Sequence, residues 1–158
     1  MLFSFQESDE LYVGELIYII SEQTLFFEPF FTHAGFSILI SGAYTSLDID
    51  HINYEAKHIS GCNPKHLWKN KRLNPPSSKR GKLLVQFEKQ IIPGTGQDYA
   101  SGWVTYFDKS NSMICIGDPV TIDSDVCIEF ASGIIAVLRG SSLIAVWAKI
   151  REIESLQL

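Results

Sequence analysis

The stretch VCIEFASGIIAVLRGSSLIAVWAKIREIESL, residues 126–156, decides the expected fold because its apolar period changes midway. Val126 to Phe130 and Ile134 to Leu138 are apolar runs on either side of Ala131-Ser132-Gly133. Two such runs around a short turn containing glycine are typical of a β-hairpin.

Beyond Arg139-Gly140 the apolar side chains fall at helical spacing, and Ser141 or Ser142 is placed to cap the first turn. The positions that share this spacing are Leu143, Val146, Trp147, Ile150 and Ile153. We therefore predict a helix from about Ser142 to Leu156 that packs across one face of a sheet.

Most of the remaining chain has strand patterns. Leu83 to Ile92 alternates apolar and polar residues, and residues 103–107 and 113–116 flank a polar loop. Residues 11–31 favour a hairpin over a helix, and Gly35 to Ile49 is either one bent strand or two short ones. Together these patterns predict an α+β fold, with a largely antiparallel twisted sheet and one C-terminal helix.

Charge is segregated along the chain. Residues 56–87 contain eight of the 13 basic residues and no acid, whereas all 18 acids and five bases lie elsewhere, for a net charge of −5. The region at about 56–82 has no steady apolar period and contains Asn-Pro turns, so we expect an irregular basic loop. The length of 158 residues predicts one domain over residues 1–158.

Three cysteines without CxxC spacing favour free thiols in a reducing compartment. No basic segment with an apolar run of signal-peptide type opens the chain, and no apolar stretch reaches the ~18 residues of a membrane helix. We expect a soluble, cytoplasmic protein that does not contact a membrane.

No motif predicts catalysis, a metal or a cofactor. His58, Cys62 and His66 have the spacing of ligands on a helix, but Gly61 and Asn63-Pro64 interrupt that helix. Asp48 and Asp50 lie on one face of an expected strand, where two like charges are more typical of a solvated edge than of an acid/base pair.

Two groups of charged residues are candidates for binding a partner. Acids between the predicted strands are the first candidate, at Asp98, Asp108, Asp118, Asp123 and Asp125. A basic cluster containing an aromatic residue is the alternative, at Lys65, Trp68, Lys69, Lys71 and Arg72.

These patterns leave three hypotheses for function. A small acidic domain without catalytic motifs suits a non-enzymatic inhibitor of the immunity type, which covers a basic toxin such as a nuclease. The first alternative is a nucleic-acid-binding module that uses the basic stretch. The second is an enzyme or carrier with a small-molecule pocket between sheet and helix.

Overall fold

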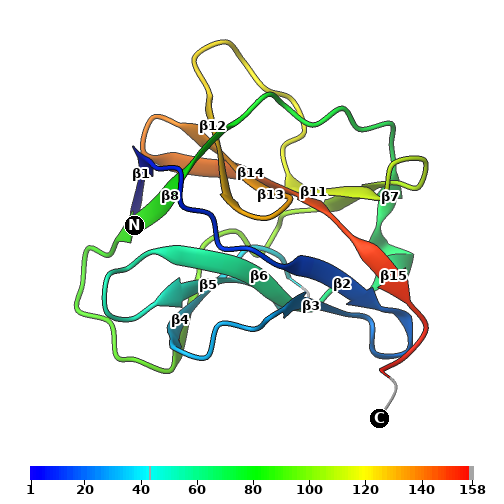
Figure 1. Ribbon diagram of the computed structural model, residues 1–158, viewed down its shortest axis with the longest axis horizontal. Coiled ribbons are helices and arrows are strands. Elements are labelled where there is room, and N and C mark those ends of the chain that lie inside the picture. Colours follow the sequence, from blue (N-terminus) through cyan, green and yellow to red (C-terminus); the bar gives the residue numbers. More distant parts are fainter. Residues whose placement is uncertain (43, 157–158) are drawn as a thin grey trace.

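Two β-sheets face each other in the computed structural model, which describes residues 1–42 and 44–156 (Figure 1). Strands make up 54% of the structure, and no helix of seven or more residues occurs in the described ranges. The expected α+β class is therefore wrong, and the protein is nearly all β.

The first sheet has eight strands in the order β1-β8-β12-β13-β14-β11-β10-β7. Most neighbours are antiparallel, but β8 with β12 and β7 with β10 are parallel, so the sheet is mixed. Its strands are β1 (Leu2–Glu7), β7 (Lys69–Asn70), β8 (Lys79–Gln86), β10 (Thr105–Asp108), β11 (Met113–Gly117), β12 (Val126–Ala131), β13 (Ile134–Arg139) and β14 (Ser142–Lys149).

The second sheet has seven strands in the order β15-β2-β3-β6-β5-β4-β9, with parallel pairs at both of its edges. Two short 3-10 helices, η1 (Ile20–Glu22) and η2 (Lys65–Leu67), lie in connections. The strands are β2 (Glu15–Ile19), β3 (Thr24–Glu28), β4 (Ala34–Leu39), β5 (Thr45–Asp50), β6 (Ala56–Cys62), β9 (Thr95–Asp98) and β15 (Arg151–Ile153).

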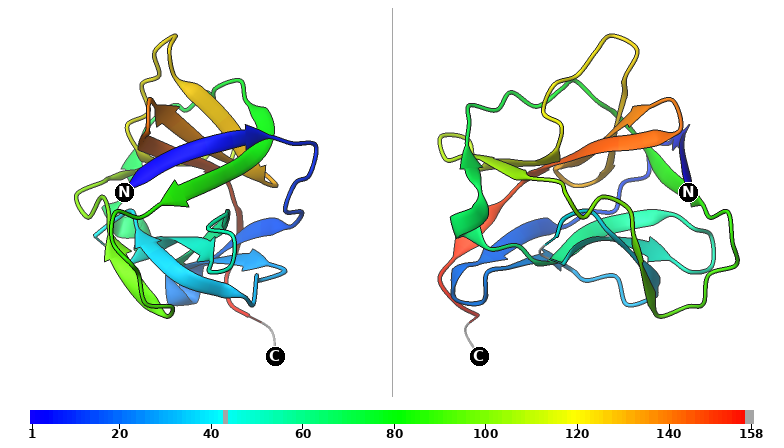
Figure 2. Two further views of the ribbon diagram at one scale, coloured as in Figure 1. Left: turned by 90° about the vertical axis from the view of Figure 1, so that its left-hand side faces the viewer. Right: turned by 180° about the vertical axis from the view of Figure 1, so that it is seen from behind.

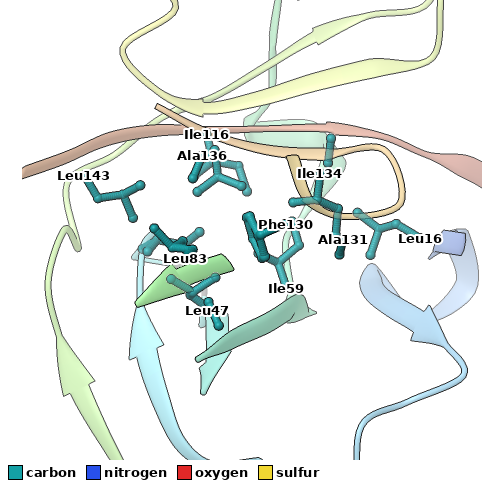
Figure 3. Packing of buried hydrophobic residues seen from close by; sticks show 14 of the residues in the cluster. Leu16, Leu47, Ile59, Leu83, Ile116, Phe130, Ala131, Ile134, Ala136 and Leu143 are labelled. Atoms are coloured by element: carbon teal, nitrogen blue, oxygen red, sulfur yellow. The ribbon is translucent and has the colours of Figure 1, made fainter. Parts of the chain in front are cut away.

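The main hydrophobic core fills the space between the two sheets (Figure 3). Leu47 and Ile59 enter it from the seven-stranded sheet, and Leu83, Phe130 and Ile134 enter it from the eight-stranded sheet. All of these side chains are at most 3% exposed, so the two sheets share one continuous core. This packing is the sheet-on-sheet arrangement of a β-sandwich.

The C-terminal segment is not a helix, so this part of the prediction is wrong as well. Gly140, with φ of 61°, and Ser141 form a two-residue turn that pairs Arg139 with Ser142, and β14 follows. Glycine suits this turn because the left-handed conformation brings no Cβ clash. The chain then crosses to the other sheet as β15 (Figure 1).

The helical spacing arose because β14 is buried on both faces. Val146 and Ala148 face the main core, whereas Ala145 and Trp147 face a smaller core on the outer side of the sheet. Leu73 lies in this smaller core, on the irregular segment 71–78 that covers that side. A strand covered on both faces has a continuous apolar run, which periodicity alone does not distinguish from a buried helix.

The hairpin predictions are confirmed. β12 pairs antiparallel with β13, β10 with β11, and β2 with β3. Gly35 to Ile49 forms two short strands, β4 and β5, instead of one bent strand. The basic region 56–82 begins with β6 and ends in β8, and residues 71–78 are its irregular part. No helix in the described ranges is long and apolar enough to span a membrane.

Candidate functional site

A loop of eight residues, 118–125, projects from the eight-stranded sheet on the side away from the other sheet (Figures 1 and 2). It joins β11 to β12, and residues 120–124 are exposed. Val120 and Ile122 expose 62% and 49% of their surface, and Asp118 and Asp123 stand beside them. The loop therefore presents a small apolar patch with acids around it.

Hydrogen bonds within the loop hold its backbone. Oδ1 of Asp118 accepts the amide of Val120 at 2.9 Å, and Oδ2 of Asp125 accepts the amide of Ile122 at 2.9 Å. The amide of Asp118 donates to the carbonyl of Ile144 on β14, which fixes the start of the loop to the sheet. Such side-chain-to-backbone bonds replace the ladder hydrogen bonds that a loop lacks.

Arg139 on β13 fixes the end of the loop through Asp125. Its Nε and one terminal nitrogen donate to the two carboxylate oxygens at 2.8 and 2.9 Å. These charge-assisted bonds lower the pKa of Asp125 and raise the pKa of Arg139. Because only 1% of the Asp125 side chain is exposed, this carboxylate supports the loop and is not offered to a partner.

The structure does not gather the five predicted acids into one surface. Asp118 and Asp123 share the loop, and Asp98 is exposed on β9 of the other sheet. Asp108 lies at the opposite end of the β10–β11 hairpin from Asp118, since it pairs with Met113. Its carboxylate accepts bonds from the Ser110 hydroxyl, the Leu73 amide and the Ser110 amide, which lower its pKa.

Sequence reasoning missed Val120 and Ile122. Both are β-branched apolar residues in a segment that also contains Pro119 and three aspartates. Residues of this type normally belong in strands, so their presence in a polar connection was a usable signal of an exposed apolar patch.

The predicted basic cluster divides into two parts. Lys69, Lys71 and Arg72 are exposed and have no ion-pair partner within residues 1–42 and 44–156. Lys71 and Arg72 line an open hollow of about 820 Å³ together with Lys109 and Asp108. Lys65 instead pairs with Glu152 on β15 and lies 5.1 Å from the centre of the Phe107 ring.

Trp68 belongs to the core and is 9% exposed. Its ring packs on Tyr18 and Phe107, and its Nε1 donates to Oδ1 of Asn63 at 2.8 Å. Because this ring is enclosed, a nucleic-acid base would have no exposed aromatic face on which to stack here.

A buried polar network joins Asp48, His58 and Ser60 between β5 and β6. His58 is fully buried, its Nε2 accepts the amide of Phe31 at 3.1 Å, and its Nδ1 lies 3.2 Å from Oδ2 of Asp48. A neutral ring therefore carries its proton on Nδ1, facing the carboxylate. The contact between His58 Nδ1 and Asp48 is close but does not have hydrogen-bond geometry. Because His58 is fully buried, the network ties strands together and has no base that faces solvent.

The expected solvated edge at Asp48 and Asp50 is wrong, because both side chains are buried. His58 and Cys62 lie on β6, while His66 is exposed on η2. Among the residues placed by the structure, no three His, Cys, Asp or Glu side chains converge as metal ligands.

No protein-family model matches this chain, and the comparison with curated proteins finds no match. The functional argument therefore depends on the geometry of the chain alone.

Proposed function

We propose that this protein is a non-enzymatic inhibitor that binds a basic protein, of the kind that an immunity protein neutralises, through loop 118–125. The observation that carries the proposal is an ordered, projecting loop with two exposed apolar side chains and two unpaired acids. The three free cysteines suit action in a reducing compartment, namely the cytoplasm.

The two apolar side chains supply surface that is removed from water when the partner binds. Val120 and Ile122 are large enough to fill a pocket on a partner, and a few such anchors normally carry most of the affinity of an interface. Ordering a flexible loop on binding reduces affinity. The bonds from Asp118, Asp125 and Arg139 remove most of that cost because the loop is already held.

The acids supply long-range attraction. Asp118 and Asp123 are exposed, and no basic side chain pairs with them in the described part of the chain. Their field, added to the net charge of −5, speeds the approach of a basic partner at low salt.

Co-expression tests the proposal. The probe is the protein encoded immediately upstream of this chain's gene, produced in a host whose growth it arrests. We expect this chain to restore growth, and Val120→Asp with Ile122→Asp to abolish the rescue. The matched control is Val13→Asp. Val13 is 70% exposed, but it precedes β2 and is distant in the sequence from loop 118–125.

A rescue that survives both loop substitutions would show that another surface binds. An upstream product that is harmless or not neutralised would overturn the inhibitor proposal.

The contribution of charge to the association rate is measured separately. Asp123→Lys should slow association about threefold at low salt, whereas Asp9→Lys, at an acid exposed elsewhere, should change it less.

Three unpaired cations around one hollow favour one second candidate, a nucleic-acid-binding module. Lys71, Arg72 and Lys109 line one hollow and could neutralise successive phosphates. Fluorescence anisotropy with a labelled single-stranded RNA tests this function. Lys71→Gln with Arg72→Gln should then reduce the salt slope by about one unit for each lost phosphate contact. An unchanged slope would exclude this surface.

A further inference from the structure

We propose that the connection 29–33, called the strap below, is a pH-sensitive element that is closed over His58 when that ring is neutral and is released when the ring takes up a second proton. The strap joins β3 to β4, and most of it is exposed, whereas the His58 side chain on β6 is fully buried. None of these residues belongs to loop 118–125, so the inference stands apart from the proposed inhibitor function.

His58 accepts a backbone hydrogen bond that only a ring with an unprotonated Nε2 can accept. The amide of Phe31 donates to this nitrogen at 3.1 Å. Because Nε2 accepts, the single proton of the neutral ring lies on Nδ1, which faces Oδ2 of Asp48 at 3.2 Å. A second proton would go to Nε2 and turn the acceptor into a donor that opposes the Phe31 N–H. The hydrogen bond to the strap and the charged ring therefore exclude each other.

In the described part of the chain, three side chains outside the strap hold it by hydrogen bonds, and His58 is one of them. The Tyr12 hydroxyl donates to the Pro29 carbonyl at 2.7 Å, and Nδ1 of His51 lies 2.9 Å from the His33 carbonyl oxygen. A carbonyl only accepts, so Nδ1 of His51 donates, and it does so in both the neutral and the charged ring. Burial raises the pKa of Tyr12, so its hydroxyl also keeps its proton. Of the three bonds, acid breaks only the one to His58.

The fixed surroundings of the ring favour its charged form. The carboxylate of Asp48 lies beside Nδ1, and the rings of Tyr12 and Phe27 stack on the imidazole with centroids 5.9 and 5.2 Å away. A nearby anion and the faces of aromatic rings both stabilise a cation. Complete burial and the Phe31 amide oppose the second proton, and both depend on the closed strap.

Other groups that can carry a positive charge gather around Phe31. Nζ of Lys57, the next residue to His58 on β6, lies 5.1 Å from the centre of the Phe31 ring and pairs with Glu55 at 3.3 Å. The His33 ring within the strap packs edge-on against the same phenyl ring. Release of the strap withdraws Phe31 and His33 from the imidazole and admits water, which solvates the new charge. The open strap and the charged ring therefore stabilise each other.

Release of the strap changes the surface of the protein. Phe30, which is 43% exposed, packs 4.9 Å from the His58 ring and would move away with the strap. The rings of Tyr12 and Phe27 would then lose part of their cover. Histidine is the side chain that ordinarily changes charge between pH 5 and 8, so mild acid would expose an apolar surface that the neutral form hides.

Hydrogen exchange of the full chain, read by mass spectrometry, tests the proposal. Protection is expressed relative to the intrinsic exchange rate at each pH. Between pH 7.5 and pH 5.5, we expect protection in the peptide that contains the strap to fall about tenfold, while protection in β13 and β14 changes by less than about twofold. Equal protection of the strap at the two pH values, or a loss that extends equally to β13 and β14, would contradict the proposal.

Three variants separate the trigger from its surroundings. His58→Gln keeps an oxygen that can accept the Phe31 amide but does not titrate, so the pH dependence should disappear. Asp48→Asn removes the charge that favours the imidazolium, so the strap should open only at a lower pH. His66→Gln changes an exposed histidine on η2 and is the matched control, which should leave the pH dependence of the strap unchanged.

A second measurement needs no substitution. Long-range nitrogen–proton NMR spectra of the unchanged protein report the protonation of each ring nitrogen. Nε2 of His58 should gain its proton with the same pH midpoint as the strap loses its protection. An Nε2 that stays unprotonated while the strap opens, or a pH dependence that persists in His58→Gln, would overturn the proposal.

Discussion

The guanidinium of Arg139 donates to both carboxylate oxygens of Asp125, at 2.8 and 2.9 Å, and so joins the end of loop 118–125 to strand β13. Without this pair, the Ile122 amide would also lose the carboxylate that it donates to. The conformation that exposes Val120 and Ile122 therefore depends on a carboxylate, that of Asp125, which is itself almost hidden from solvent.

The first prediction concerns the pH dependence of this pair. The hydrogen bonds from Arg139 lower the folded pKa of Asp125, so their stabilising effect is complete above the unfolded pKa of about 3.9. It disappears as the pH falls through the lower, folded pKa. Asp125→Asn should therefore reduce the unfolding midpoint at pH 7 and match the unchanged protein in strong acid. Equal midpoints at pH 7 would contradict the pairing.

The second prediction tests the outer core. Trp147→Ala should cost about 3–5 kcal/mol of unfolding free energy, measured by denaturant titration, because the side chain is 2% exposed. Leu73→Ala should cost about 2–5 kcal/mol, since Leu73 packs in the same cluster. If the two losses simply add in the double variant, the two side chains do not pack together.

The third prediction concerns the buried network around Asp48. Its carboxylate accepts from the Ser46 hydroxyl at 3.0 Å and from Ser60, and it faces His58. Asp48→Ala should cost about 1–3 kcal/mol for each buried donor that loses its acceptor, and Asp48→Asn should cost less because one acceptor oxygen remains. A loss for Asp48→Ala as small as that for the exposed control Asp9→Ala would show that the network is not formed.

The fourth prediction ranks the thiols. Burial raises the pKa of Cys115 to about 12, and burial also raises the pKa of Cys127, so few thiolates form at either site near neutral pH. Iodoacetamide at pH 8 should modify Cys62 first in the native protein and all three cysteines after denaturation, as read by mass spectrometry. A Cys115 that reacts as fast as Cys62 would contradict its burial.

Local sequence was sufficient for three hairpins whose strands are close along the chain, β2–β3, β10–β11 and β12–β13, but not for β13–β14. The apolar runs on either side of Ala131-Ser132-Gly133 and of residues 109–112 predicted their hairpins. Two apolar runs that are joined by a short polar or glycine-containing turn pair most simply as antiparallel strands. The segregation of charge was also readable directly from residues 56–87.

Candidate site residues were only partly predictable. Asp118 and Asp125 are both aspartates in one loop, yet Asp118 is exposed and Asp125 is enclosed by Arg139, 14 residues further along the chain. Trp68 stands among lysines in the sequence but packs against Tyr18 and Phe107. The difference in each case comes from a contact between distant residues, which no local pattern contains.

The sequence by itself determined the turns at residues 109–112 and 131–133, the order of most strands along the chain and the uneven distribution of charge, because each depends on neighbouring residues. Only the tertiary structure decided that residues 142–149 form a strand, since a second covering layer that includes Leu73 buries the face that holds Trp147. Whether a strand is buried on both faces of its sheet depends on segments far away in the chain. The spacing of apolar residues is interpreted as if a segment buried only one face. A strand that is buried on both faces therefore resembled a helix, although the fold places a central strand here.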